Sequence, residues 1–219
     1  MDLLIPAAGY ATRMNGMPKF LLPINLSGQS LLFKHIKLAS GFYEKIRIAT
    51  REEFSPLLNR ELLGENVEIT LMSTRTMSET ILNLARESKS DHFGLVMPDT
   101  FFLGGSPHSF LTSQRNDLGI AAWKIRPEQR GKLGQLEIAG DSATKVVDKD
   151  PNCDFPYAWG ALSFSRDFLQ LIEVEMPHIG YGIPEWLSSK GVNSCEIIDG
   201  EYYDCGTPSE YFSLLNKIT

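Results

Sequence analysis

Two basic residues near the start of the chain follow a run of small residues, and this combination suits a polyphosphate anion. The apolar segment Leu3–Ile5 is typical of a buried strand, and Ala7-Ala8-Gly9 begins two residues after it. Small side chains let backbone N–H groups approach a phosphate closely, and Arg13 and Lys19 supply positive charge that the backbone lacks. We therefore expect a binding site for a nucleoside triphosphate.

An acidic residue, Asp99, follows the apolar segment Gly94–Pro98, where a strand would reach its carboxyl end. Mg²⁺ typically takes one or two carboxylates from a protein, while phosphate oxygens and water complete its shell. An Asp between Pro98 and Thr100 is also common in a turn or at the N-cap of a helix. The residues alone leave both interpretations open.

The opening segment resembles the signature of a known enzyme family. It lacks the third glycine of a G-x-G-x-x-G loop and the G-K-[ST] ending of a P-loop. From Ile5 to Leu22, with an Arg followed by Pro18-Lys19, it resembles the start of the nucleotidyltransferases with a GT-A-like fold. This family includes the sugar-1-phosphate nucleotidyltransferases, or NDP-sugar pyrophosphorylases. The segment departs from it at Ala11, where many members have glycine, and in its short spacer Asn15–Met17.

Two later segments also resemble this family. Pro98-Asp99 is similar to its G-D element, and Tyr202–Pro208 is similar to its aromatic-x-D-x-G-T-P motif. The resemblance implies that Asp99 and Asp204 together hold Mg²⁺ as the cofactor. It also implies that Arg13 neutralises the triphosphate and that Lys19 places the attacking phosphate against the α-phosphate.

Four residues carry the resemblance on the acceptor side. Val146–Pro151 resembles the family's E-K-P element, which implies that Lys149 binds the acceptor phosphate and that Asp148 contacts sugar hydroxyls. Asp148 is shorter than the usual Glu, and a solvated turn would explain the same residues. Gly134 and Gly160 resemble glycines that let the backbone approach the sugar, although a β-bulge is another reason for glycine in a strand.

The nucleobase side of the resemblance is less specific. It implies nucleotide contacts from Ala7-Ala8-Gly9 and from Thr76 and Ser78, within the segment Thr74–Thr80. Related sugar enzymes carry a different motif here, so no base preference is transferred. Ser78 is alternatively the cap of the helix that follows it.

Strand-like and helix-like segments must position these residues. They alternate through the first half of the chain, which predicts a mostly parallel sheet with helices on both faces. We expect strands at residues 3–5, 45–50, 67–72 and 93–97, and helices at residues 30–40, 52–63 and 78–87. Ligands of such sheets bind outside the carboxyl ends of the strands, where Arg13 and Asp99 lie.

After about Gly119 the pattern changes to short strands separated by turns, at residues 120–125, 134–138, 144–148 and 157–164. Thr207, Pro208 and Glu210 are typical of the N-cap, N1 and N3 positions of a last helix. We therefore expect a single α/β domain over residues 1–219, with a three-layer, Rossmann-like, mixed but mostly parallel sheet. Residues 1–118 would form the nucleotide-binding half, and residues 119–219 the β-rich acceptor-binding half with its closing helix.

The composition is typical of a soluble globular protein, with 42% hydrophobic and 22% charged residues. No apolar run approaches the roughly 20 residues of a membrane-spanning helix, and we expect a cytoplasmic protein without export signal or membrane contact. The three cysteines form no C-x-x-C pair, and the four histidines lack the spacing of zinc ligands. The net charge of −6 argues against non-specific binding to nucleic acid.

These observations predict an enzyme that uses Mg²⁺ to transfer a nucleotidyl group from an NTP to a phosphorylated small molecule. The first choice of acceptor is a sugar 1-phosphate, with an NDP-sugar and pyrophosphate as products. One alternative is a cytidylyltransferase for a non-sugar phosphate, such as a polyol phosphate or phosphocholine. Another is a non-catalytic regulatory subunit that binds a nucleotide sugar, which the set Arg13, Lys19, Asp99 and Asp204 argues against. The oligomeric state is left open.

Overall fold

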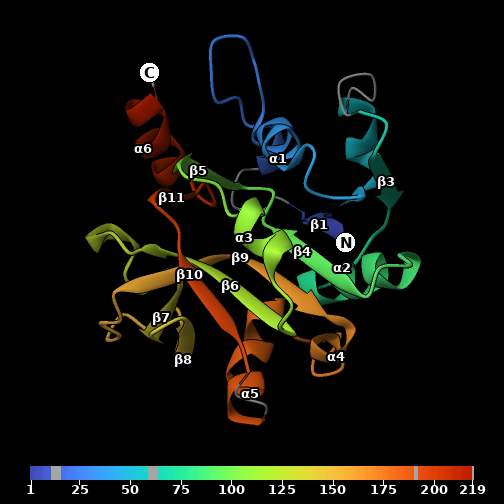
Figure 1. The fold of residues 1–219 in the computed structure, drawn as a ribbon. Helices are drawn as coiled ribbons and strands as arrows, with labels where there is room; N and C mark the ends of the chain where they lie inside the picture. The colour runs from blue at the N-terminus through green and yellow to red at the C-terminus, as the bar shows by residue number, and fades with distance from the viewer. Residues whose placement is uncertain (11–15, 59–63, 190–191, 219) are drawn as a thin grey trace.

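The structure is a computed structural model that describes residues 1–10, 16–58, 64–189 and 192–218. In this part of the chain, a nine-stranded mixed sheet forms the centre of the molecule (Figure 1). Four strands from the first half run parallel in the order β4-β1-β2-β3. They are β1 (Asp2–Ala7), β2 (Lys45–Thr50), β3 (Val67–Leu71) and β4 (His92–Val96).

Strands from the second half extend the same sheet beyond β4. The next strand, β9, is antiparallel to both of its neighbours, β4 and β6, and β10 then pairs parallel to β6. A hairpin of β7 and β8 joins β9 on one side. These strands are β6 (Leu118–Lys124), β7 (Gly134–Ala139), β8 (Ser142–Asp148), β9 (Tyr157–Ser165) and β10 (Ser194–Ile197). The added β-rich half therefore continues the parallel sheet through one reversed strand.

A separate two-stranded sheet joins β5 (Thr100–Gly104) to β11 (Gly200–Asp204). The strands are antiparallel, and Asp204 pairs with Thr100. Because Asp99 directly precedes β5, this pairing brings Asp99 close to the end of β11. Helix α6 (Pro208–Ile218) follows and packs beside this small sheet.

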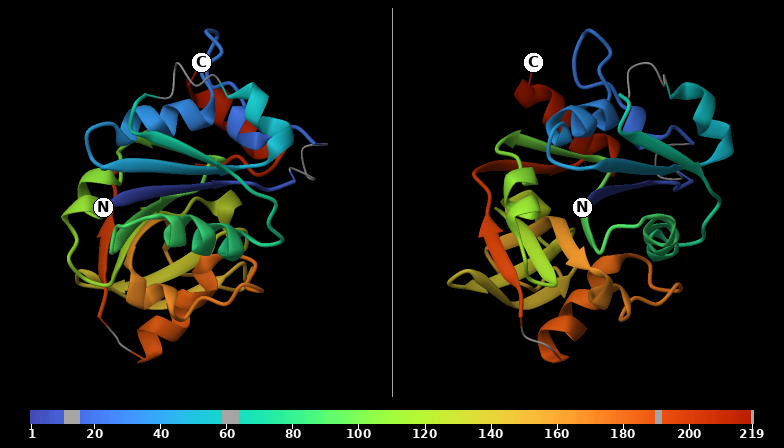
Figure 2. Two further views of the ribbon diagram at one scale, coloured as in Figure 1. Left: turned by 90° about the vertical axis from the view of Figure 1, so that its right-hand side faces the viewer. Right: turned by 45° about the vertical axis from the view of Figure 1, so that its right-hand side comes forward.

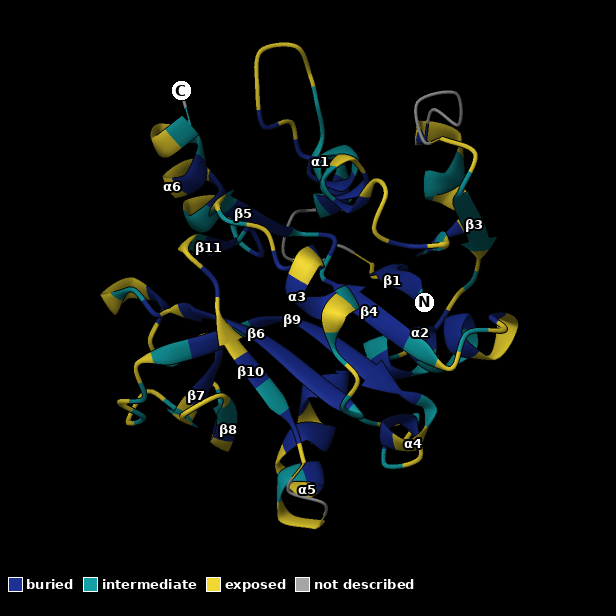
Figure 3. Ribbon diagram, viewed as in Figure 1, coloured by how far each residue is buried: buried dark blue, intermediate teal, exposed yellow. Residues whose placement is uncertain are grey.

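Helices cover both faces of the large sheet, which gives the predicted three layers (Figure 2). Side chains alternate along β1, so Leu3 and Ile5 join the core beneath α1 and α3, whereas Leu4 joins the core beneath α2, α4 and α5. Figure 3 shows that most residues along the central strands of this sheet are buried. The helices are α1 (Leu31–Ala39), α2 (Met77–Glu87), α3 (His108–Ser113), α4 (Arg166–Leu169) and α5 (Gly182–Ser189).

One predicted helix is confirmed only in part, because its described part is a 3₁₀ helix and not an α-helix. Residues 52–63 were expected to be helical, but Glu52–Leu57 forms a 3₁₀ helix, and residues 59–63 lie outside the described ranges. Pro56 lies within this segment and has no N–H to donate to an α-helical bond. None of the described helices combines the length and the apolar character that crossing a membrane requires.

Candidate active site

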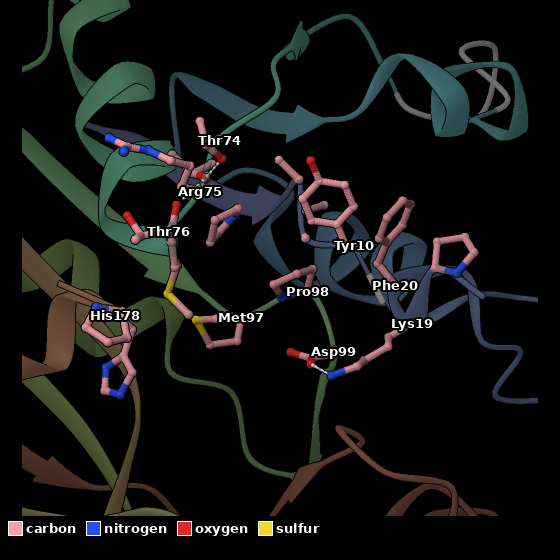
Figure 4. Close-up of a pocket in the computed structure, with 18 of the residues that line it drawn as sticks. Tyr10, Lys19, Phe20, Thr74, Arg75, Thr76, Met97, Pro98, Asp99 and His178 are labelled. Atoms are coloured by element: carbon pink, nitrogen blue, oxygen red, sulfur yellow. Dashed lines mark hydrogen bonds and ion pairs between the residues drawn. The ribbon is translucent and has the colours of Figure 1, made fainter. Parts of the chain in front are cut away.

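A cavity of about 510 Å³ opens at the carboxyl ends of β1 and β4 (Figure 4). Its walls come from the loop after β1, the start of α2, the residues after β4 and two segments of the second half. The predicted site residues in its lining are Ala7, Ala8, Gly9, Lys19, Thr76, Asp99 and Lys149. The structure therefore brings together residues from three of the motifs. Arg13 lies outside the described residues, so its predicted role stays a prediction.

Lys19 and Asp99 form an ion pair at one end of this cavity. Lys19 Nζ donates to Asp99 Oδ2 at 3.2 Å, and the two side chains are 18% and 21% exposed. Lys19 begins a 3₁₀ turn that is anchored in the core by buried Phe20, and Asp99 lies between the end of β4 and the start of β5. A cation and a carboxylate at one edge of the sheet suit phosphate and metal chemistry together.

Asp204 adds a second carboxylate beside this pair. Its neighbour Cys205 donates its backbone N–H to the carbonyl oxygen of Asp99 at 2.8 Å, and the N–H of Gly206 donates to Asp204 Oδ1 at 2.8 Å. Burial, followed by the negative charges of Asp99 and Glu210, raises the pKa of Asp204 to about 7. The protein alone therefore stabilises the negative charge of the ionised Asp204 carboxylate poorly. A bound cation would stabilise that charge.

The donor set fits Mg²⁺. Among the described residues, no group of three or more His, Cys, Asp or Glu side chains is arranged for a metal, and the candidate ligands are the two carboxylates of Asp99 and Asp204. Mg²⁺ prefers oxygen ligands and keeps several waters or phosphate oxygens in its shell, so two protein carboxylates suffice. Of these two carboxylates, Asp99 lines the cavity and Asp204 does not.

Thr76, and not Ser78, caps α2. Thr76 Oγ1 accepts a hydrogen bond from the N–H of Glu79 at 3.0 Å and donates to the carbonyl oxygen of Val174. The alternative role of Ser78 as a cap is therefore wrong, because the helix starts at Met77. Ser78 is fully buried, does not line the cavity, and its hydroxyl has no hydrogen-bond partner among the described residues. Its contact with a nucleotide stays a prediction that this placement does not favour.

The segment Val146–Pro151 contains a lysine in a rare backbone conformation and an aspartate paired with a histidine. Lys149 lines the cavity with φ of 51°, a conformation that a residue with a Cβ seldom adopts. Asp148 Oδ2 lies 3.3 Å from Nε2 of His178. Burial alone would raise the pKa of Asp148, but the hydrogen bond from His178 and the charges of His178 and Lys149 outweigh burial and lower it. Asp148 is therefore held as a carboxylate.

The two predicted acceptor glycines contact aromatic rings. A Cβ atom on Gly134 would lie 2.1 Å from Nε1 of Trp159, and one on Gly160 would lie 2.5 Å from the ring of Tyr202. Both positions therefore need glycine for packing within the protein, and neither residue lines the cavity. Trp123 is also a core residue, stacked on Phe102 at 5.0 Å. The predicted contact of both glycines with an acceptor remains untested.

Among the cavity residues to which the sequence analysis gave no role are His178 and Tyr10. His178 lines the cavity and is only 9% exposed, and its partner Asp148 is 30 residues away along the chain. No spacing rule connects these two residues, so the sequence held no signal for them. Tyr10 also lines the cavity. Its position directly after Gly9 could have drawn attention to it.

No family model matches this sequence, and no curated protein matches it either. Solved structures do match the fold. A Bacillus anthracis protein named as a glucose-1-phosphate thymidylyltransferase, in complex with sucrose, has a TM-score of 0.80 at 17% identity, over 100% of this chain and 95% of that chain. A UDP-glucose pyrophosphorylase complexed with UDP-glucose has a TM-score of 0.79 at 17% identity, over 99% of this chain and 97% of that chain.

The inositol-1-phosphate CTP transferase from T. maritima is similar as well, with a TM-score of 0.75 at 14% identity, over 99% of this chain and 95% of that chain. These identities are low, so the likeness establishes the fold and not the reaction. Nearly the whole of each chain is covered in all three comparisons, including the β-rich second half. The chain therefore has the fold of the sugar-1-phosphate nucleotidyltransferases, as its motifs predict.

Proposed function

We propose that the protein is an Mg²⁺-dependent nucleotidyltransferase that joins an NTP to a sugar 1-phosphate, forming an NDP-sugar and pyrophosphate. The observation that carries this proposal is the ion pair of Lys19 and Asp99, with Asp204 beside it, at the charged end of a cavity formed by Ala7-Ala8-Gly9. The nucleotide would bind in the half formed by residues 1–118, and the acceptor would bind against residues 119–219.

In this reaction an oxygen of the acceptor phosphate attacks the α-phosphorus of the NTP. The new P–O bond forms as the bond between the α-phosphorus and the bridging oxygen breaks, and pyrophosphate leaves with the electron pair. No protein nucleophile is needed, because positioning and charge neutralisation supply the catalysis. Mg²⁺, when bound, would neutralise phosphate charge.

The residues of the chain would divide this work between the two substrates. Asp99 and Asp204 would hold Mg²⁺, which suits the burial of two neighbouring carboxylates. Lys19 would turn from Asp99 to the phosphates, and Arg13 would share the charge of the triphosphate. Lys149 and the ionised Asp148 would orient the acceptor.

A cytidylyltransferase for a polyol phosphate is the second candidate. It is supported by the likeness to an inositol-1-phosphate CTP transferase, which covers as much of this chain as the likeness to the sugar enzymes does. The packing of Trp159 on Gly134 also places an indole where a sugar was expected to approach the backbone. Both candidates share the same cavity and the same charge arrangement.

The test is pyrophosphate release in the presence of Mg²⁺. CTP, UTP, dTTP, GTP and ATP are screened against sugar 1-phosphates, polyol phosphates and phosphocholine. We expect release with one specific pair, and loss of release with EDTA or in Asp204→Ala. Folded protein that releases no pyrophosphate with any pair, and binds no NTP, would contradict the proposal and favour a binding subunit for another ligand.

A further inference from the structure

Tyr10 presents an open aromatic face to the nucleotide cavity. It follows Gly9 in the loop after β1, lines the cavity and is 58% exposed. In the view of Figure 4, its ring lies beside the loop, on the side of the cavity where Thr74, Arg75 and Thr76 also lie. The proposed mechanism gives this ring no task.

Arg51 covers the other face of the ring. Its Cζ lies 3.7 Å from the centroid of the Tyr10 ring, which is the geometry of a stacked cation–π contact. Arg51 directly follows β2, whose last residue Thr50 pairs with Ala7, so the contact joins two neighbouring strand ends. Since a ring has two faces and Arg51 covers one, the exposed area of Tyr10 belongs to the second face and the edges.

Arg51 is itself held in place. It is only 9% exposed, and its Nε donates a hydrogen bond to Glu53. Its Nη1 is buried without a hydrogen-bond partner among the described residues, so the contacts that fix the guanidinium there are the Tyr10 ring and Glu53. Burying part of a cation in this way costs free energy. We attribute this burial to the need to keep the stacked ring in one orientation.

The cavity around Tyr10 suits a flat, largely apolar group. Its charged end is marked by Lys19 and Asp99, whereas apolar side chains form much of the remaining wall. These apolar residues are Pro6, Met77, Met97 and Pro98. Of the parts of an NTP, the nucleobase is the flat one, and bases stack on exposed aromatic faces without needing a particular hydrogen-bond pattern.

We propose that Tyr10 stacks on the nucleobase of the bound NTP and that Arg51 is a positioning residue that holds the ring for this contact. The inference rests on the proposed function, because it requires an NTP in the cavity. It adds a binding residue to the nucleotide side of the site and explains why an arginine lies behind the phosphate loop. It also implies that this contact contributes affinity for every base, and more for purines, which have the larger face.

The first test measures the affinity of Mg²⁺–NTP and of Mg²⁺–tripolyphosphate by calorimetry. Tyr10→Ala should weaken NTP binding by roughly 5- to 150-fold, which corresponds to the loss of one base–aromatic stack, and should leave tripolyphosphate binding unchanged. Tyr10→Phe keeps the ring and should bind NTP within about twofold of the unaltered chain. An equal loss for both ligands in both variants would instead assign a phosphate contact to the hydroxyl and overturn the proposal.

The second test asks whether Arg51 acts through Tyr10. Arg51→Met should weaken NTP binding by about 2- to 5-fold, and it should cause no further loss when combined with Tyr10→Ala. The same loss in both backgrounds would mean that Arg51 contacts the nucleotide directly and would overturn its positioning role. Arg115→Met, at the opposite edge of the sheet beyond α3, is the matched control for the lost charge.

The failure of this inference differs from the failure of the proposed function. If the unaltered, folded chain binds NTP and releases pyrophosphate but Tyr10→Ala binds NTP equally well, only the stacking contact is wrong. If the unaltered chain binds no NTP at all, both are wrong. Because Tyr10 is exposed, its substitution leaves the core intact, and thermal unfolding of each variant verifies the fold.

Discussion

Lys19 Nζ lies 3.2 Å from Asp99 Oδ2, and this ion pair ties the segment after β1 to the end of β4. Each partner balances the charge of the other. In the proposed reaction, however, Lys19 is needed for a phosphate and Asp99 for Mg²⁺. In this reaction, the lysine would exchange this contact for a phosphate, and the carboxylate would exchange it for Mg²⁺. The pair therefore keeps a charged site compact and ready for substrate.

Lys19→Ala should reduce turnover by roughly 10²- to 10³-fold, because it removes one preorganised cation from the developing phosphate charge. Arg13→Ala should have an effect of the same order. Steady-state pyrophosphate release measures both. Lys89→Ala is the matched control, since Lys89 is exposed and precedes β4 at the opposite edge of the sheet. Normal turnover in either site variant, with its fold intact, would remove that residue from the mechanism.

Asp204→Asn should stabilise the metal-free protein while it abolishes activity. The buried carboxylate of Asp204 lies beside Asp99, and the mutual repulsion of the two charges disfavours the folded state unless a cation is present. In EDTA at pH 8, we expect the variant to melt a few degrees above the unaltered chain, at about 2–4 °C for each kcal/mol of repulsion relieved.

Added Mg²⁺ should raise the melting temperature of the unaltered chain and leave that of Asp204→Asn nearly unchanged. Thermal unfolding with and without the metal measures both effects. An equal stabilisation of the two proteins by Mg²⁺ would show that Asp204 is not a ligand. A lower melting temperature of the variant in EDTA would show that the carboxylate has a structural role.

Two buried histidines should make the fold sensitive to acid. Burial lowers the pKa of His35 from its ordinary value of 6.5 to about 4 and that of His108 to about 3. The unfolded chain therefore binds protons that the folded chain does not bind as the pH falls below 6.5. Stability from these residues is complete above that pH and is lost as the pH falls toward 4, by on the order of 2 kcal/mol for each histidine at pH 5.

The measurement is urea unfolding between pH 7.5 and pH 4.5. His35 Nε2 donates to the carbonyl oxygen of Thr100 at 2.8 Å, and His35→Gln keeps a donor there without an ionisable ring. This variant should lose about half of the acid sensitivity that the two histidines cause together. An unchanged pH dependence in His35→Gln would show that this histidine is not the source.

Much of the site could be predicted because it depends on local motifs at strand ends. Ala7-Ala8-Gly9 and Asp99 follow strands that prove parallel, and the carboxyl ends of parallel strands share one edge of the sheet. Lys149 reached the same cavity from the second half, as its motif implied. The three-layer fold followed from the alternation of strands and helices.

The remaining features depend on contacts between distant segments. The antiparallel direction of β9 could not be predicted from the hydrophobic pattern, because a buried strand has the same pattern of apolar residues in either direction. Gly134 and Gly160 were interpreted as open to a ligand, but the rings that fill their space come from Trp159 and Tyr202. The pair of His178 and Asp148 likewise forms only through the tertiary fold.

Lys149 offers a test in which binding and backbone strain change separately. Its φ of 51° is costly for a residue with a Cβ, by roughly 1–2 kcal/mol, and costs glycine nothing. Both Lys149→Gly and Lys149→Met remove the ammonium group, so both should raise the KM for the acceptor by about 10- to 100-fold. The KM for the NTP should stay within about twofold if Lys149 has the proposed role of binding the acceptor phosphate.

The two variants should differ in stability. Lys149→Gly relieves the strained backbone and should melt above Lys149→Met, which keeps the Cβ and the length of the side chain. Kinetics with each substrate varied in turn, together with thermal unfolding, give both readouts. If the KM for the NTP rose as much as that for the acceptor, Lys149 would belong to the triphosphate site. If the acceptor KM changed in neither variant, the strained conformation would serve the turn before Pro151 and not the substrate.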